Sequence, residues 1–309
     1  MPLPKPRKGE GLNEFVGRCV IDPTMTSEFP NKDQRLAVCN SLHEQSSETL
    51  SKAFGDKYRD AFERQRQMTE SRNIRNVQSI YFNEYNKAVT EFLRSGTFNQ
   101  AIVFQDDVLT MMYVNLFVDT GLHFANWYYN SFEILITKAE RRSPLIYNRQ
   151  WELQFTHYAK EVAGINIRLL KGTALDTLKK VTAKLLQDPE FQRMGAIEQG
   201  RVLRSRFKMI SMYQAERIVR TETTTIANYA TEQSALTVFP KEKLMKRWST
   251  SLDGRERLWH NAANNQERDY SQPFDVGGEA IHRAGEGSSK NRINCRCATI
   301  WIPKASSLG

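Results

Sequence analysis

The sequence lacks several features that define whole classes of protein. Its 309 residues contain only four cysteines, too few for the disulfide framework of a small secreted domain. It has no P-loop, no glycine-rich dinucleotide-binding fingerprint and no Ser-His-Asp signature, so the motifs of the common nucleotide-binding enzymes and serine hydrolases are missing. No repeat or low-complexity array is visible. With 40% hydrophobic and 26% charged residues, collagen-like, mucin-like and wholly disordered chains are excluded.

Long apolar runs are also missing. The N-terminal segment 1–10 has no apolar stretch of the kind that a secretory signal requires, so none is expected. The most apolar stretch, residues 108–129, is interrupted by four polar residues: Asn115, Asp119, His123 and Asn126. These interruptions favour a buried helix over a membrane span. We therefore expect a soluble chain that is made in a cytoplasm and has no membrane partner.

Basic residues outnumber acidic ones, with 44 Lys and Arg against 35 Asp and Glu, which gives a net charge of +9. Such a balance permits a nucleic-acid partner without requiring one. Within one helical region the basic residues crowd together: Arg193, Arg201, Arg204, Arg206, Lys208, Arg217 and Arg220. They form either a solvated basic face or a phosphate-binding surface. Aromatic residues are not interleaved there for base stacking, so any DNA contact is expected to be sequence-independent.

Hydrophobic periodicity predicts a mainly helical body before Pro240. The expected helices run from Ser46 or Ser47 to Gly96, then over about 100–140, 150–163, 172–186 and 196–236. After Pro240 the periodicity stops, and residues 243–248 and 298–302 have strand character. We expect an α+β fold, with little strand before Pro240. The expected units are a basic extended tail, a small cysteine-containing unit, the helical body and a small α+β C-terminal module, at 1–12, 13–44, 45–236 and 237–309.

The N-terminal unit contains Cys19 and Cys39. The spacing from these cysteines to His43 could ligate a metal, but we expect two short packed segments with reduced, buried thiols. The preceding residues 1–12 carry three prolines and several basic residues, which favour an extended chain that would face DNA.

Glu222 falls on the apolar stripe of the helix expected over 196–236. The stripe consists of Ala215, Ile218, Val219, Ile226 and Tyr229. A carboxylate is costly to bury alone, so Glu222 is expected to find a cation or several N–H donors. Two interpretations follow: a structural buried polar node, which we favour, and a catalytic carboxylate.

The C-terminal module is dense in residues that can take part in chemistry: Asp253, Arg255, Arg257, His260, Asp269, His282, Asn294, Cys295 and Cys297. On a strand, Cys295 and Cys297 would point to one face, but with Cα atoms about 7 Å apart a disulfide between them is disfavoured. Two thiolates and His260 suit zinc, with His282 or Asp269 as a further ligand. Buried free thiols and a redox or nucleophilic role are the alternatives. We expect no cofactor; if a metal is bound, zinc is the candidate. We also expect Arg255, Arg257 and His260 to point toward residues 294–297.

Several motifs of the second half resemble those of the phage head morphogenesis proteins, the family of the phage Mu F protein and related minor head proteins of tailed phages. They are, in order, Arg220-Thr221-Glu222-Thr223; Trp248 with Asp253, Arg255, Arg257 and His260; a glycine-containing loop; and Asn294-Cys295-Arg296-Cys297. Many members carry a Pro-Gly-Asp loop where this chain has Ala284-Gly285-Glu286, in which Glu286 retains the charge. The segment from Arg18-Cys19 to Cys39 looks like a short cysteine element that recurs in tailed-phage head proteins.

The resemblance implies a minor head protein of a tailed phage or prophage. Such a protein would be assembled in the host cytoplasm, lie inside the virion head near the portal vertex, and act in head morphogenesis and in DNA retention or ejection. The implied partners are the portal protein, through the apolar stretch 108–129, the major capsid protein, and packaged double-stranded DNA, through the basic region 193–220. The alternatives are a free cytoplasmic phage DNA-binding protein and an enzyme that uses Glu222, His260 and the thiols. No enzyme is expected, because the segment after the last motif is too short for the toxin or transferase domain that some members carry there.

Overall fold

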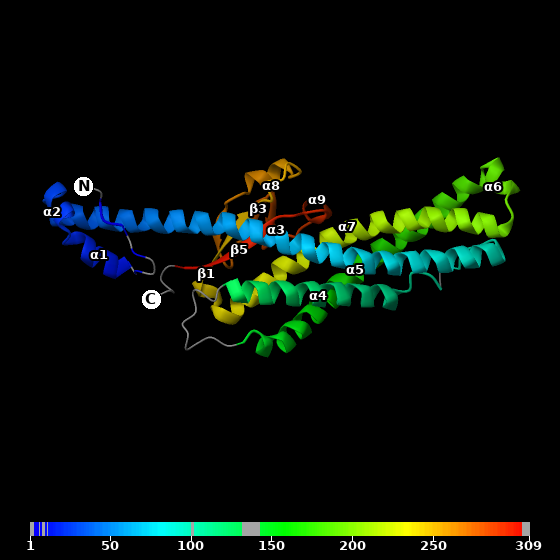
Figure 1. The fold of residues 1–309 in the computed structure, drawn as a ribbon, viewed down its shortest axis with the longest axis horizontal. Coiled ribbons are helices and arrows are strands. Elements are labelled where there is room, and N and C mark those ends of the chain that lie inside the picture. Colours follow the sequence, from blue (N-terminus) through cyan, green and yellow to red (C-terminus); the bar gives the residue numbers. More distant parts are fainter. Residues whose placement is uncertain are drawn as a thin grey trace.

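The computed structural model describes residues 3–5, 7, 10, 12–99, 102–131 and 143–304, and for residues 12, 43–56 and 165 it describes the backbone alone. The molecule is elongated and 71% helical, with a small C-terminal module on the side of a long helical body (Figure 1). The expected α+β class, with a mainly helical body, is confirmed.

The longest element is helix α3, Lys32–Ser95. Its N-cap is Asn31, whose side-chain oxygen accepts hydrogen bonds from the backbone N–H groups of Asp33 and Gln34. Gly96 ends the helix in the left-handed region, at φ 72°, as expected. The expected start near Ser46 or Ser47 is wrong, because the helix continues through those serines and its cap lies further upstream.

Four further helices complete the body: α4 (Asp106–Ser131), α5 (Leu145–Leu186), α6 (Pro189–Arg193) and α7 (Ala196–Val238). Helix α7 packs against both α3 and α4, and α4 packs against α5. The two helices expected over 150–163 and 172–186 are one continuous helix, α5, because Gly164 and Gly172 lie within it without breaking it.

Helix α4 supplies much of the core. Among the described helices it alone is long and apolar enough to cross a membrane, but half of its most apolar window is buried inside the structure. Phe117, Phe124 and Tyr128 are fully buried among side chains of the neighbouring helices. The interpretation of residues 108–129 as a buried helix therefore fits the packing.

The C-terminal module contains two small antiparallel sheets. Strands β1 (Leu244–Ser249), β2 (Glu267–Asp269) and β5 (Ala298–Pro303) form a sheet in the order β2-β1-β5, and β3 (Phe274–Val276) pairs with β4 (Glu279–Ile281). The short helix η2 (Lys241–Lys243) precedes β1, α8 (Leu258–Ala262) lies between β1 and β2, and α9 (Ser289–Arg292) lies between β4 and β5. The described part of the chain has no strand before Pro240, as expected.

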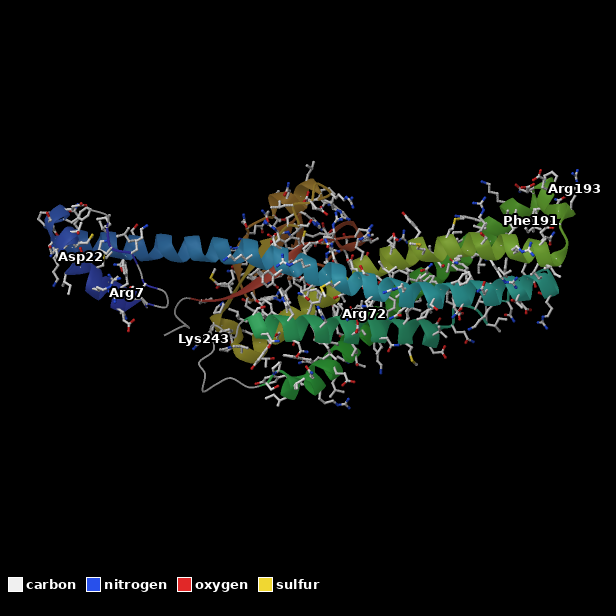
Figure 2. The ribbon with its side chains drawn as sticks, viewed as in Figure 1. Arg7, Asp22, Arg72, Phe191, Arg193 and Lys243 are labelled. Carbon is white, nitrogen blue, oxygen red and sulfur yellow. A yellow bond between two sulfur atoms is a disulfide. The ribbon has the colours of Figure 1, made fainter. Side chains whose placement is uncertain are left out.

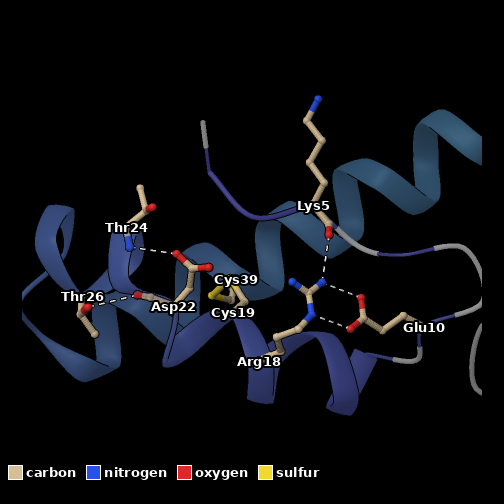
Figure 3. The surroundings of a disulfide bond; sticks show 8 residues. All are labelled: Lys5, Glu10, Arg18, Cys19, Asp22, Thr24, Thr26 and Cys39. Carbon is tan, nitrogen blue, oxygen red and sulfur yellow. Dashed lines mark hydrogen bonds and ion pairs between the residues drawn. A yellow bond between two sulfur atoms is a disulfide. The ribbon is translucent and has the colours of Figure 1, made fainter. Parts of the chain in front are cut away.

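The N-terminal unit is closed by a disulfide between Cys19 and Cys39, with Cα atoms 6.0 Å apart (Figure 3). The expectation of reduced thiols is wrong. Helix α1 (Leu12–Val20) packs against the first turns of α3, with α2 (Pro23–Glu28) between them in sequence, so two cysteines that are 20 residues apart meet. A disulfide leaves no thiolate to bind a metal, and the side chain of His43 lies outside the described residues.

Arg18 connects the described part of the N-terminal tail to this unit. Its guanidinium donates to the carboxylate of Glu10 over 2.8 Å and to the backbone carbonyl of Lys5 over 3.0 Å (Figure 3). Most of the segment expected to be an extended tail lies outside the described residues.

Candidate functional site: the contact between helix α7 and the C-terminal module

The Arg-Thr-Glu-Thr motif lies inside helix α7, where the helix contacts the C-terminal module. Thr221 Oγ1 accepts a hydrogen bond from the backbone N–H of Asn294 over 3.1 Å. Thr224, just after the motif, donates to the backbone carbonyl of Cys295 over 2.5 Å. The helix continues to Val238, close to the expected end at 236, so the motif lies well inside it. Its hydroxyls hold the backbone of the segment that carries the second motif.

Asn228, one turn further along α7, continues this contact into β5. Its amide nitrogen donates to the carbonyl of Cys297 over 3.2 Å, and its amide oxygen accepts from the N–H of Thr299 over 2.6 Å. From α4, the hydroxyl of Tyr128 donates to the carbonyl of Trp301 over 2.7 Å and accepts from its N–H over 3.2 Å. Because β5 is an edge strand, these side chains satisfy backbone groups that would otherwise be unpaired.

The loop at Gly285 also packs directly on α7. The hydroxyl of Thr225 donates to the carbonyl of Gly285 over 2.9 Å. Gly285 has a φ of +86°, and a Cβ there would lie 2.7 Å from the Cα of Thr225. Only glycine fits this close approach. The neighbouring Glu286 forms an ion pair with Arg283 over 2.5 Å, so its charge is used within the loop.

Glu222 is buried in the same contact, with 4% of its surface exposed. Its carboxylate pairs with Arg292 of α9 over 2.5 Å and accepts hydrogen bonds from Tyr113 (3.3 Å) and Asn166 (3.4 Å). Burial raises the pKa of Glu222, and the charge of Arg292 opposes this shift. The expected cation is therefore present. This arrangement, which joins α4, α5, α7 and α9, fits the structural node rather than the catalytic carboxylate.

A second buried carboxylate, Glu232, lies on the same helix and was not singled out from the sequence. It pairs with Arg283 (2.5 Å) and His282 (2.8 Å) and accepts from the hydroxyl of Tyr270 (2.8 Å). Burial raises its pKa, but the hydrogen bond with His282 and the charge of Arg283 outweigh burial and leave the pKa lowered. The available signal was its position three residues after Tyr229 of the apolar stripe.

His260, Cys295 and Cys297 meet in the interior of the module. The imidazole Nδ1 of His260 lies 3.3 Å from Cys297 Sγ and 3.9 Å from Cys295 Sγ, and all three side chains are buried. The hydrogen bond between the two thiols lowers the pKa of Cys295 and raises that of Cys297. The ring of Trp248 packs edge-on against the imidazole, with centroids 5.6 Å apart. The cysteines precede β5 and do not lie within it, contrary to the expectation of a strand.

The two residues considered as a further zinc ligand lie elsewhere. His282 bonds Glu232 and Lys246, and Asp269 pairs with Lys304 over 2.6 Å. In the described part of the chain, the group of potential ligand atoms around the thiols consists of His260, Cys295 and Cys297, all within 4.8 Å of one another. The expected completion of the site by His282 or Asp269 is therefore wrong.

Part of the second half of the chain matches a known protein family. Residues 171–300, which include α7, both buried carboxylates and both thiols, match the family described as Phage Mu protein F like protein. This region belongs to the Phage Mu protein F-like family. Comparisons with curated proteins and with solved structures gave no match. The resemblance that the motifs indicated is therefore confirmed over residues 171–300, here called the Mu F-like region.

The charged residues of the motif from Trp248 to His260 form ion pairs and hydrogen bonds with the segment that carries the cysteines. Asp253 pairs with Arg296 over 3.1 Å, and Arg257 donates to the carbonyl of Ile293 over 2.6 Å. His260 thus contacts Cys295 and Cys297 as expected, and Arg257 bonds the residue just before the expected segment 294–297. Arg255 does not follow them, since its side chain is exposed and its backbone N–H bonds Asp253.

The basic residues of the Mu F-like region differ in exposure and, within α7, in the face of the helix on which they lie. The exposed members are Arg193, Arg201, Arg206, Lys208 and Arg217. Arg204 is half-buried and donates to Thr90, and Arg220 lies 4.0 Å from Glu70. Arg201 and Lys208 are seven residues apart on one face of α7, and Arg206 falls on another face. Figure 2 shows Arg193 at the end of the molecule opposite the N-terminal unit.

Proposed function

We propose that this protein is a minor head protein of a tailed phage or prophage, which lies inside the head near the portal vertex and acts in head assembly and in DNA retention or ejection. The observation that carries the proposal is the Mu F-like region over residues 171–300. The family is one of phage structural proteins, generally without enzymatic activity, and it points to the virion head.

The use of the motif residues supports a structural role. Thr221, Thr224 and Asn228 bond the backbone of the segment that leads into β5, and Glu222 is paired with Arg292 in the interior. These groups fix the module on the helical body. A module that is fixed in this way on an elongated helical scaffold suits a protein that bridges the components of an assembly.

The proposed DNA contact rests on the exposed basic residues near the end of the body. Arg201 and Lys208 share a face of α7, close in sequence to Arg193 at the tip of the molecule (Figure 2). Contacts of this kind bind phosphates without reading bases, and they weaken as salt displaces them.

The proposed portal contact cannot use most of the apolar stretch 108–129. Its large side chains Met112, Tyr113, Phe117, Phe124, Tyr128 and Tyr129 are buried in the core, while Met111 is 63% exposed. The contacts with the portal protein and the major capsid protein are therefore proposed from the family, with other exposed surfaces of the body as the binding face.

The test combines DNA binding and portal retention across a salt series, with the portal protein of the same phage. The doubly substituted R201Q/K208Q should bind double-stranded DNA more weakly than the wild type and show a shallower salt dependence, because phosphate contacts are lost. It should retain the portal protein as well as the wild type does. The matched control is R149Q, an exposed arginine on α5 outside the Mu F-like region. Unchanged DNA affinity in R201Q/K208Q would contradict the proposal that Arg201 and Lys208 contact DNA. Failure of the wild type to retain the portal protein at low salt would contradict the proposed portal contact.

A further inference from the structure

We propose that His260, Cys295 and Cys297 bind a zinc ion that stabilises the C-terminal module. This site goes beyond the proposed role in the head, because a structural metal is a property of the module itself and can be measured on the isolated protein.

The donor atoms have the spacing of a metal site. Zinc bound at about 2.0–2.1 Å to a histidine nitrogen and about 2.3 Å to a cysteine sulfur, with tetrahedral angles, separates these two atoms by about 3.6 Å. The distances from His260 Nδ1 to the two sulfurs, 3.3 and 3.9 Å, lie on either side of this value. Small shifts of the side chains would therefore place one ion within bonding distance of all three donors.

The imidazole of His260 is held in the orientation that a metal ligand needs. Its Nε2 lies 3.1 Å from the side-chain oxygen of Asn291, which also accepts from the indole N–H of Trp259 over 2.7 Å. The amide nitrogen of Asn291 donates to the carbonyl of Val276 over 3.2 Å, so its oxygen faces the imidazole. Nε2 therefore carries the proton and Nδ1 directs its lone pair at the two thiols. Histidines that ligate metals are commonly fixed in this way by a second hydrogen bond.

The module also has reason to depend on a metal. Leu244 of β1 and Ile300 and Trp301 of β5 pack into the core of the helical body. The thiols lie in a separate, small apolar cluster with Trp248 and Phe274, and the strands β2, β3 and β4 have three residues each. Units with so small a core commonly rely on a metal or a disulfide. Cys295 and Cys297 are free and buried, and both sulfurs face one imidazole. Three protein ligands leave a fourth position for a water molecule.

The first test measures metal on the full-length wild type, purified without chelator and in the presence of a reductant. We expect about one zinc per chain. After removal of zinc, titration with Co²⁺ should give a thiolate-to-cobalt absorption band that saturates at one equivalent. A wild-type protein that contains no zinc and binds neither Zn²⁺ nor Co²⁺ stoichiometrically would overturn the proposal, without bearing on the role in the head.

The second test assigns the ligands. C295S/C297S and H260N should lose the zinc and the cobalt band. The matched controls, C19S/C39S in the N-terminal unit and H157N on the exposed face of α5, should keep both. Since a ligand variant can also misfold, circular dichroism accompanies each measurement, and the stoichiometry of the wild type decides independently. Zinc that persists at full stoichiometry in C295S/C297S would contradict the assignment of the site.

Discussion

Replacing Arg292 by methionine tests whether the buried ion pair between Glu222 and Arg292 stabilises the fold. Methionine keeps much of the apolar volume but removes the guanidinium that lies 2.5 Å from the carboxylate of Glu222. The carboxylate, 4% exposed, is then left with the hydroxyl of Tyr113 and the amide of Asn166. Removing one partner of a buried ion pair leaves an uncompensated charge in the interior, which is strongly destabilising.

The size of the loss has an upper limit, because the carboxyl group takes up a proton when its charge becomes too costly. From an ordinary pKa of 4.5, protonation of the Glu222 carboxyl group in the folded state costs about 1.4 kcal/mol per pH unit. The cost is therefore at most about 3.5 kcal/mol at pH 7 and below about 1 kcal/mol at pH 5. The lost hydrogen bonds from Arg292 to Thr225 and Asn166 add about 1 kcal/mol at both pH values. We expect R292M to lower the free energy of unfolding by up to about 4.5 kcal/mol at pH 7 and by about 2 kcal/mol at pH 5.

The direction of this pH dependence follows from proton linkage. The pKa of Glu222 is raised by burial, so above pH 4.5 the folded state binds more protons than the unfolded state. Stability therefore falls as the pH rises from 4.5 to the folded pKa. In R292M that pKa is higher still, because the favourable charge of Arg292 is gone, and the variant loses more stability over this window than the wild type.

Urea unfolding at pH 5 and pH 7, followed by circular dichroism, measures these differences. R292M/E222Q should be more stable than R292M at pH 7, because glutamine removes the uncompensated charge. The control R149M, at an exposed arginine, should change stability by less than about 0.5 kcal/mol. An equal loss at both pH values in R292M, with a further loss on adding E222Q, would refute the charge pairing.

Three further predictions concern other parts of the fold. G285A should lose about 2–4 kcal/mol of stability, because the new Cβ would meet the backbone of Thr225 at a φ of +86°. The control G278A has a similar φ but open space around it, and it should lose about 1 kcal/mol. Equal losses of the two variants in urea unfolding would contradict the close packing of Gly285 on α7. C19S/C39S should destabilise the N-terminal unit by about 3 kcal/mol. Mass spectrometry of the alkylated, unreduced wild type should find Cys19 and Cys39 unmodified, and alkylation of both cysteines would show that the disulfide is absent. Burial lowers the pKa of Lys246 from 10.5 to about 8, so between these pH values the unfolded state binds more protons than the folded state. The free energy of unfolding should therefore rise with pH across this window, and K246M should lack this rise. An identical pH profile of stability for the wild type and K246M would exclude the contribution of Lys246.

The helices of the body were largely predictable from the sequence, but the start of the first long helix, α3, was not. Periodic apolar residues gave the helices, and the loss of that period after Pro240 gave the module. The start of α3 was misplaced because a pair of serines suggested a cap, although the side chain of Asn31 provides one upstream. The disulfide was missed for a different reason: whether Cys19 and Cys39 meet depends on how α1 packs on α3, which local sequence does not specify.

The site shows the same division. The position of Glu222 on an apolar stripe predicted that it needs a partner, but the partner, Arg292, is 70 residues away. The approach of His260 to both thiols was expected from the motifs, whereas the second carboxylate node at Glu232 was not. Local pattern reveals which residue must be satisfied, and tertiary packing decides which residue satisfies it.

The role in the phage head is tested most directly by the protein content of purified particles. DNA-filled heads of the phage or prophage that carries this gene would be treated with nuclease, separated from free protein by sedimentation, and analysed by mass spectrometry. The proposal predicts that the chain sediments with the heads and remains after nuclease treatment, because its retention depends on protein contacts as well as on DNA. Its absence from the heads, together with recovery in the soluble fraction bound to DNA, would contradict the proposal and favour a free DNA-binding protein.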